Sequence, residues 1–261
     1  MSSTYGASWL TKVADEQYGD NADIVHKFGR NTAVGTSFVP VTFGGVYPTP
    51  QVGSATQLRI KAGGDANDDA AGTGAREVTL IGLDANGDEV TEAIATAGAS
   101  ASSATTNSFI RLYRAYVSAS GTYATASAGS HAASITIENS AGGTDWLTID
   151  AAAFPLAQSE VGAYSVAAGK KAYVFSAYAA TDSSKSTDIV FFQRTSILQT
   201  AEPYDAMRVV FDIKSTEAFV DFAPRAPLGP FVGPCDLGFM AKVSSTTSEV
   251  SVDFELLVVD A

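Results

Sequence analysis

The sequence predicts an all-β protein in which two β-domains follow an extended N-terminal arm with one short helix, and the C-terminal domain is a jelly-roll-like β-sandwich. Three observations lead to this prediction. Apolar and polar residues alternate along residues 250–256, which gives a strand one apolar and one polar face. Short β-rich segments separated by turn residues recur across residues 161–259, a spacing typical of sandwiches and barrels. The Asn86-Gly87 pair lies between two β-rich segments and is a strong hairpin signal.

Residues 1–55 are predicted to form the arm. Within them, residues 8–18 are predicted as the short helix, with Ser8 as its N-cap and with Trp9 and Val13 on one face. A helix of this length is marginal without packing. The arm has too few apolar positions to fold alone, so we expect it to lie against another surface, either of this chain or of a neighbouring one.

Residues 56–150 are predicted to form the first β-domain. The segments 77–83 and 89–94 flank the Asn-Gly turn and should pair as a hairpin, because both turn residues tolerate positive φ. The tracts 97–107 and 119–133 are rich in Ala, Ser, Thr and Gly. We predict them to be loops, because such segments bury too little surface to order themselves.

Residues 151–261 are predicted to form the second β-domain, the sandwich. On its last strand, Val250, Val252, Phe254 and Leu256 alternate with polar residues. Burying each large apolar side chain contributes ~1.5–3 kcal/mol, so four on one face can anchor a strand.

The composition indicates an acidic protein. The chain of 261 residues has 28 Asp and Glu against 16 Lys and Arg, a net charge of −12. This argues against nucleic-acid binding, which needs clustered basic residues. No stretch approaches the ~20 apolar residues of a membrane helix, and no secretory signal can be recognised. The single cysteine, Cys235, excludes an internal disulfide, fits cytosolic synthesis and is expected to be a small buried apolar residue.

Two acidic turns resemble the start of a calcium-binding loop. Residues 65–69 and 84–88 both have the Asp-x-Asn-x-Asp pattern, but neither continues with the required Gly and Glu, and the same residues are good turn formers. His26, His131 and Cys235 have no neighbouring groups that would make them a catalytic base or nucleophile. The sequence therefore predicts a protein that is not an enzyme and has no catalytic residues, metal or cofactor.

The candidate contact residues lie in two places. The first is the arm, and the second is the Pro/Gly-rich loop 224–234, which is either a rigid apolar contact or a tight corner of the sandwich. The candidates are Trp9, His26, Lys27, Phe28 and Arg30 in the arm, with Leu228 and Phe231 in the loop.

Three passages resemble a group of tailed-bacteriophage virion proteins common in marine phages. The first is residues 26–31 (HKFGRN). The second is residues 69–87, which begin DAAGTGAR and end GLDANG, with 109–111 (FIR) and 114–117 (RAYV). The third is residues 164–173 (YSVAAGKKAY) with 254–260 (FELLVVD). The resemblance implies a structural component of the virion with no enzymatic activity.

The leading hypothesis is a capsid decoration or cement protein, made in the host cytoplasm, that binds the major capsid protein on the outside of the head through its N-terminal region. The resemblance alone implies a homotrimer. One alternative is a receptor-binding module of the tail or fibre. Another is a carbohydrate-binding or carbohydrate-hydrolysing β-sandwich, although the aromatic residues at strand spacing favour core packing.

Overall fold

The computed structural model describes residues 21–45, 47, 54–125, 129–151, 157–182, 185–222 and 227–261. This described part is built of strands joined by loops, with one short 3-10 turn, η2 (Phe43–Gly45), and no α-helix. The strands are β1 (Ala22–Val34), β2 (Val39–Pro40), β3 (Leu58–Ile60), β4 (Ala75–Leu83), β5 (Glu89–Ala95), β6 (Arg111–Ser120), β7 (Ile135–Asn139), β8 (Asp145–Ile149), β9 (Ala163–Val166), β10 (Lys170–Thr181), β11 (Thr187–Arg194), β12 (Arg208–Thr216), β13 (Phe219–Phe222), β14 (Leu228–Val232), β15 (Cys235–Val243) and β16 (Ser248–Asp260).

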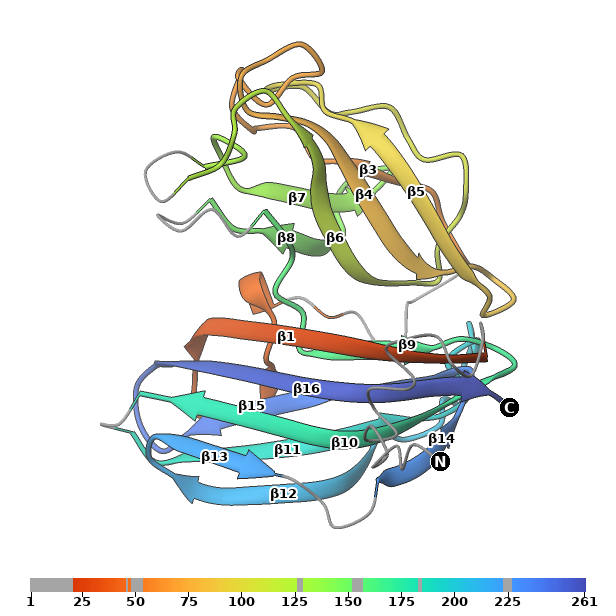
Figure 1. The fold of residues 1–261 in the computed structure, drawn as a ribbon, viewed down its shortest axis with the longest axis vertical. Helices are drawn as coiled ribbons and strands as arrows, with labels where there is room; N and C mark the ends of the chain where they lie inside the picture. The colour runs from red at the N-terminus through yellow and green to blue at the C-terminus, as the bar shows by residue number, and fades with distance from the viewer. Residues whose placement is uncertain are drawn as a thin grey trace, which may run out of the picture.

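The strands form four antiparallel sheets arranged in two bodies, one above the other in Figure 1. The larger body contains two five-stranded sheets. One has the order β1-β16-β10-β13 with β14 also on β10, and the other has the order β12-β11-β15-β2 with β9 also on β15. The smaller body contains two three-stranded sheets, β3-β7-β8 and β5-β4-β6. All of its strands lie between β2 and β9 in the sequence, so the chain leaves the larger body once and returns to it.

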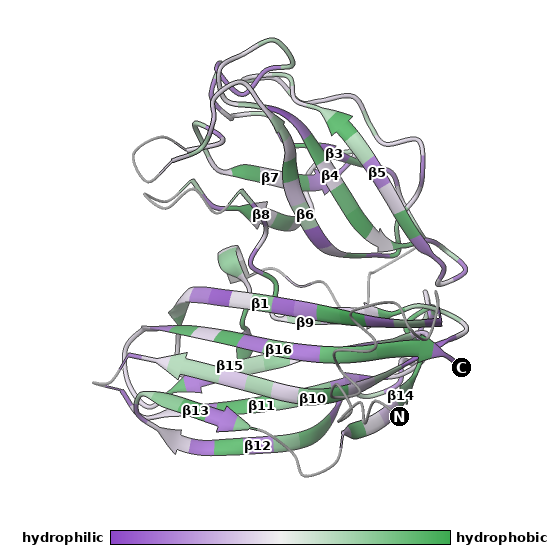
Figure 2. Ribbon diagram, in the orientation of Figure 1, coloured by the Kyte–Doolittle hydropathy of each residue, from purple (hydrophilic) through white to green (hydrophobic). Residues whose placement is uncertain are grey.

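The core of the larger body lies between its two sheets. The predicted alternation on β16 is confirmed, because Val250, Val252, Phe254 and Leu256 are all almost fully buried there. Phe254 packs near Phe239 of the opposite sheet, with ring centroids 5.4 Å apart. Figure 2 shows hydrophilic bands along β1 and β16, and the polar residues that alternate with the buried ones on β16, Ser251, Asp253 and Glu255, are partly exposed.

The smaller body has its own core, to which both of its sheets contribute. Leu80 of β4 and Ile137 of β7 are fully buried in it. The predicted hairpin is confirmed, because β4 and β5 pair antiparallel from Glu77–Ala95 to Leu83–Glu89 on either side of the turn. Gly87 has φ +84° in that turn, which explains why a glycine suits it.

The fold prediction of an arm with a short helix followed by two β-domains, the last a jelly-roll-like sandwich, was wrong. The described chain instead forms four sheets without an α-helix, and β1 and β2, both from the predicted arm, are strands of the two larger sheets. The segment looked like an arm because the inward face of β1 carries Lys27, Gly29 and Asn31, which give no apolar alternation. The predicted helix, residues 8–18, lies outside the described residues.

The two bodies share side chains across their boundary, which we call the junction. Leu83, Ile110 and Tyr113 of the smaller body belong to the core of the larger body. In the other direction, Val161 and Ala163 belong to the core of the smaller body. The contact between the bodies is therefore partly a continuation of both cores.

Candidate functional site

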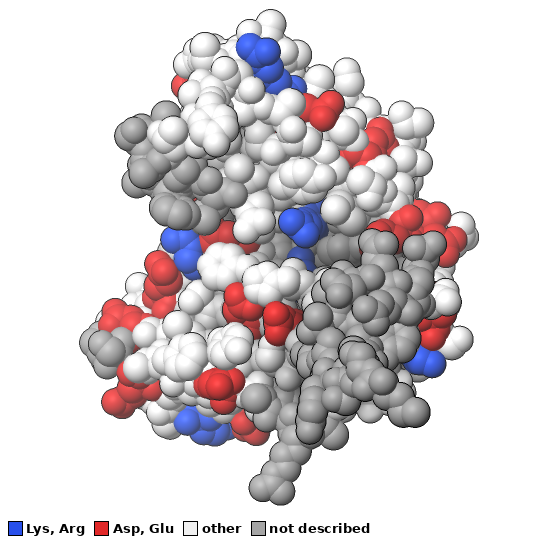
Figure 3. All heavy atoms as spheres, viewed as in Figure 1, with Lys and Arg blue, Asp and Glu red and all other residues white. Residues whose placement is uncertain are grey.

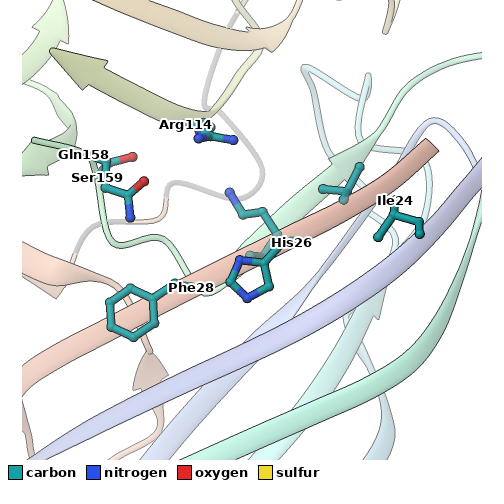
Figure 4. A pocket seen from close by; sticks show the side chains of 8 residues that line it. Ile24, His26, Phe28, Arg114, Gln158 and Ser159 are labelled. Atoms are coloured by element: carbon teal, nitrogen blue, oxygen red, sulfur yellow. The ribbon is translucent and has the colours of Figure 1, made fainter. Parts of the chain in front are cut away.

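A hollow on the surface lies at the junction, beside β1. It has a volume of about 370 Å³ and is lined by Ile24, Val25, His26, Lys27, Phe28, Arg114, Gln158 and Ser159. Figure 4 shows Arg114 of β6 and the pair Gln158 and Ser159 on one side of it, with His26 and Phe28 of β1 on the other. We call this feature the junction hollow. Three of the predicted contact residues, His26, Lys27 and Phe28, therefore come together at one place.

Lys27 is the most unusual group in the junction hollow. The residue is only 5% exposed. Its Nζ donates a hydrogen bond to the Tyr113 carbonyl oxygen at 2.6 Å and lies 5.4 Å from the centre of the Tyr113 ring. Burial, followed by the positive charge of Arg114, lowers its pKa from 10.5 to about 7, because both disfavour the charged amine.

The other polar side chains of the junction hollow differ in their hydrogen-bond and ion-pair partners. His26 Nε2 lies 2.7 Å from Asp253 Oδ1 on the neighbouring β16. Ser159 Oγ accepts a hydrogen bond from the Ala115 backbone N–H at 2.9 Å. The Arg114 guanidinium is exposed and lies 5.5 Å from the centre of the Tyr116 ring.

Arg30, the fourth predicted contact on β1, takes part in an internal ion-pair cluster. Its guanidinium donates to both carboxylate oxygens of Glu160 and, at 3.0 Å, to Asp150 Oδ2. Hydrogen bonding to Glu160 raises the pKa of Arg30, while burial raises the pKa of the Glu160 carboxyl. The side chain therefore links β1 to the chain that returns from the smaller body.

Deeper in the junction lies an ion pair that the sequence analysis missed. Arg111 of β6 and Asp236 of β15 have side chains 1% and 0% exposed, with Nε 3.0 Å from Oδ2. Ser165 Oγ donates to Asp236 Oδ1 at 2.6 Å, and Arg111 Nη1 donates to the Ile110 carbonyl at 2.8 Å. No local signal could have found this pair, because the partners are 125 residues apart.

Two aromatic rings also meet at the junction. Tyr113 and Tyr164 are arranged edge to face with centroids 5.0 Å apart, and the Tyr113 hydroxyl donates to Glu89. Burial raises the pKa of both tyrosines. They are thus neutral hydrogen-bonding and packing groups rather than bases.

The outer face of the β1-β16-β10-β13 sheet carries an exposed aromatic cluster. Tyr178 and Phe219 are stacked with centroids 5.9 Å apart and are 38% and 61% exposed. Together with Phe28 they line a second, shallower hollow of about 280 Å³. Figure 3 shows basic side chains at the boundary of the two bodies, with acidic side chains both at the boundary and below it.

The remaining predicted contact residues are Trp9, Leu228 and Phe231, of which the described two, Leu228 and Phe231, do not line the junction hollow. Trp9 lies outside the described residues. Leu228 and Phe231 belong to β14, where Leu228 packs against the larger core and Phe231 is only 5% exposed within it. The Phe231 side chain is therefore occupied by the core and not available to a partner. Cys235 is fully buried, as predicted, and its burial raises the pKa of its thiol to about 12.

The acidic turns use their carboxylates internally. Asp65 Oδ1 accepts the Asn67 backbone N–H, and Asp84 Oδ1 accepts those of Asn86 and Asp88, all within 3.0 Å. Among the described residues, no three His, Cys, Asp or Glu side chains are grouped so that they could hold a metal ion. No helix in this part of the chain is long and apolar enough to cross a membrane.

Comparisons with known proteins do not identify a family for this chain. No family model matches the sequence, and no curated protein matches it. One similar chain is in the structure of infectious bursal disease virus Gt strain, with 11% identity, 97% of this chain and 78% of that chain covered, and a TM-score of 0.23. Another is in the crystal structure of the infectious bursal disease virus VP2 subviral particle, with 9% identity, 98% and 83% covered, and a TM-score of 0.21. Scores this low do not establish a common fold.

Proposed function

We propose that the protein is a non-enzymatic structural component of a tailed-phage virion, and that it decorates the outer surface of the head. The observation that carries this proposal is where the three phage-like passages of the sequence meet. They lie far apart in the chain, yet the structure brings parts of all three together at the junction.

Short contacts connect these passages. Lys27 of the first passage donates to the carbonyl of Tyr113, which lies between the two short segments of the second. The Tyr113 ring contacts Tyr164 of the third, and β1 pairs along its length with β16, which ends in the third. A resemblance scattered over the sequence thus becomes one connected framework, as expected if it reflects a shared architecture.

The exposed apolar side chains suggest how such a protein would attach. Six of the seven large exposed apolar side chains among the described residues belong to the larger body, and only Tyr123 belongs to the smaller one. The six are Phe38, Tyr178, Met207, Val209, Phe219 and Val232. We propose that the larger body, with the N-terminal residues that precede β1, rests on the major capsid protein while the smaller body projects. A stable contact of this kind buries about 1,000 Å² or more.

The test is binding to undecorated heads, measured by co-sedimentation. Deleting residues 1–20, or replacing Val209 by Asp, should lower occupancy at least tenfold while circular dichroism stays unchanged. Tyr123→Asp on the smaller body is the matched control and should bind like the wild type. Full occupancy of both larger-body variants would refute the proposed orientation.

Copy number on purified particles decides between the head and other sites. Decoration requires hundreds of copies per particle, whereas a tail or fibre part, the alternative role, requires a dozen or fewer. The homotrimer implied by the resemblance is tested on the free protein by sedimentation equilibrium. A carbohydrate-binding role would instead appear as glycan binding that is lost on Tyr178→Ala.

A further inference from the structure

The junction hollow is lined by two basic side chains, Lys27 and Arg114, in a protein where acidic residues are in excess. The chain has 28 Asp and Glu against 16 Lys and Arg. Nearby basic groups find carboxylates: His26 Nε2 lies beside Asp253 Oδ1, and Arg30 is paired with Asp150 and Glu160. Among the described residues, however, neither Lys27 nor Arg114 has a carboxylate within ion-pair distance.

This arrangement makes the protonated form of Lys27 costly. Its ammonium exchanges water for a single carbonyl acceptor, that of Tyr113, although it has three protons to donate. Burying a charge without an opposite charge costs far more than burying a neutral polar group. An anion bound in the hollow would offset this cost and would also reduce the repulsion between Lys27 and Arg114.

The hollow also has the size and the lining of a small-ligand site. Its volume of about 370 Å³ falls in the range of ligand pockets, which combine apolar walls with a few convergent polar groups. Ile24 and Phe28 supply apolar surface. The side-chain amide of Gln158 and the hydroxyl proton of Ser159 have no hydrogen-bond acceptor among the described residues, so both can bind hydroxyl groups.

We propose that the junction hollow binds a small carboxylate that carries hydroxyl groups, the chemistry of a sugar acid, with Lys27 and Arg114 on its carboxylate and with Gln158 and Ser159 on its hydroxyls. A singly charged anion fits better than a phosphate monoester, because the net charge of −12 and the nearby Asp253 oppose a dianion. This site does not depend on the proposed role in the virion.

Binding should be linked to protonation. The charged and titratable groups around Lys27 are Arg114 and Tyr113 on β6, Glu89 behind the Tyr113 hydroxyl, and the His26–Asp253 pair. With its pKa near 7, Lys27 is mostly neutral at pH 8, and a bound carboxylate favours the charged form. The protein should therefore take up a proton when it binds the anion at pH 8.

The experiment is isothermal titration calorimetry of the full chain with D-glucuronate, acetate, D-glucose and inorganic phosphate. Glucuronate should bind most tightly, and in buffers of different ionisation enthalpy its binding at pH 8 should show proton uptake. Arg114→Gln, at an exposed position that should not disturb folding, is expected to weaken glucuronate at least tenfold, and Lys27→Met to abolish both binding and proton uptake. Lys171→Met on β10, away from the hollow, is the control and should change nothing.

Several results would overturn the proposal. These are glucose or phosphate binding as tightly as glucuronate, unchanged affinity in Arg114→Gln, or no heat from glucuronate at 10 mM, a concentration well above the ~1 mM Kd expected of a weak small-ligand site. Binding of free glucuronate but not of a polyuronate would assign the site to a free acid, and binding of both to a polysaccharide residue. Either source is consistent with the proposed chemistry.

Discussion

The ion pair between Arg111 and Asp236 offers the sharpest test of how the two bodies are joined. It connects β6 of the smaller body to β15 of the larger one, and both side chains are almost completely buried. Its geometry is incompletely satisfied, because Arg111 Nη2 has no hydrogen-bond partner among the described residues. The pair therefore carries a large desolvation cost, which its mutual attraction and the hydrogen bonds from Ser165 and to the Ile110 carbonyl offset.

Replacing Arg111 by Met should destabilise the protein strongly. The change keeps most of the side-chain volume but leaves the Asp236 carboxylate buried with Ser165 as its remaining side-chain donor. Removing one partner of a buried pair costs about 3–5 kcal/mol. Asp236→Asn, which leaves the guanidinium without its counter-charge, should cost a similar amount for the same reason.

The double variant, Arg111→Met with Asp236→Asn, should be more stable than either single variant, because no uncompensated charge remains in it. The assay is urea unfolding followed by circular dichroism and by the fluorescence of tryptophan. A matched surface control is the Lys170–Asp260 pair, whose atoms are 2.7 Å apart but whose side chains are 35% and 55% exposed. Lys170→Met should cost less than about 1 kcal/mol. Costs for the two junction variants that simply add in the double would refute the reasoning, since coupling is what the geometry demands.

Two further predictions concern β1. A methyl group on Gly29 would lie 2.1 Å from the Gly162 backbone nitrogen, whereas one on Gly35 would meet nothing within 4 Å. Gly29→Ala should therefore destabilise the protein by at least ~1–3 kcal/mol, while the control Gly35→Ala should leave the urea midpoint nearly unchanged. Equal effects of the two substitutions would contradict the close approach of the backbone at Gly29. Burial and then Arg114 lower the pKa of Lys27 from 10.5 to about 7, so the unfolded chain binds more protons in this range. The stability of the wild type relative to Lys27→Met should rise by ~2 kcal/mol from pH 7 to pH 9, and a difference that is constant with pH would show that Lys27 keeps its ordinary pKa.

Local patterns predicted the features that are local in physical origin. The alternation along residues 250–256 predicted which side chains of β16 are buried, because a strand exposes its side chains to opposite faces in turn. The Asn86-Gly87 hairpin was predicted for a similar reason, since its geometry is set by the two turn residues themselves. Burial of Cys235 followed from its residue type and needed no knowledge of its neighbours.

The position of β1 in its sheet could not be predicted from local sequence patterns. Its pairing partner β16 lies more than two hundred residues further on, so their contact leaves no signature in either segment. The buried positions in the middle of β1 are Lys27, Gly29 and Asn31, and Lys27 reaches the Tyr113 carbonyl of the smaller body. That face of the strand therefore shows no apolar alternation in the sequence. The one available signal was Gly29, because an isolated glycine within a β-rich segment often marks a close approach of another backbone.

Only the part of the candidate site that lies on one continuous segment could be predicted from the sequence. His26, Lys27 and Phe28 attracted attention as neighbours in sequence, and they do line one hollow. Arg114, Gln158 and Ser159 complete it from two other segments, and only the fold brings them there. Arg30, chosen as an outward contact, turned out to be held by Glu160 and Asp150, whose positions the sequence could not indicate.

The chemistry of the junction explains why the hollow can have a defined shape. If the contact between the two bodies were only apolar, one body could slide against the other, because hydrophobic burial is non-directional. Here the apolar contact of Tyr113 with Tyr164 is combined with the pairs Arg111–Asp236 and Arg30–Glu160. Buried ion pairs and their hydrogen bonds are satisfied in only one relative position of the bodies, and any slip would leave a charge unpaired. Residues that line the junction hollow are close neighbours of these groups in the chain, Arg114 beside Tyr113 and Ser159 beside Glu160. A binding site there would therefore need little reorganisation before use.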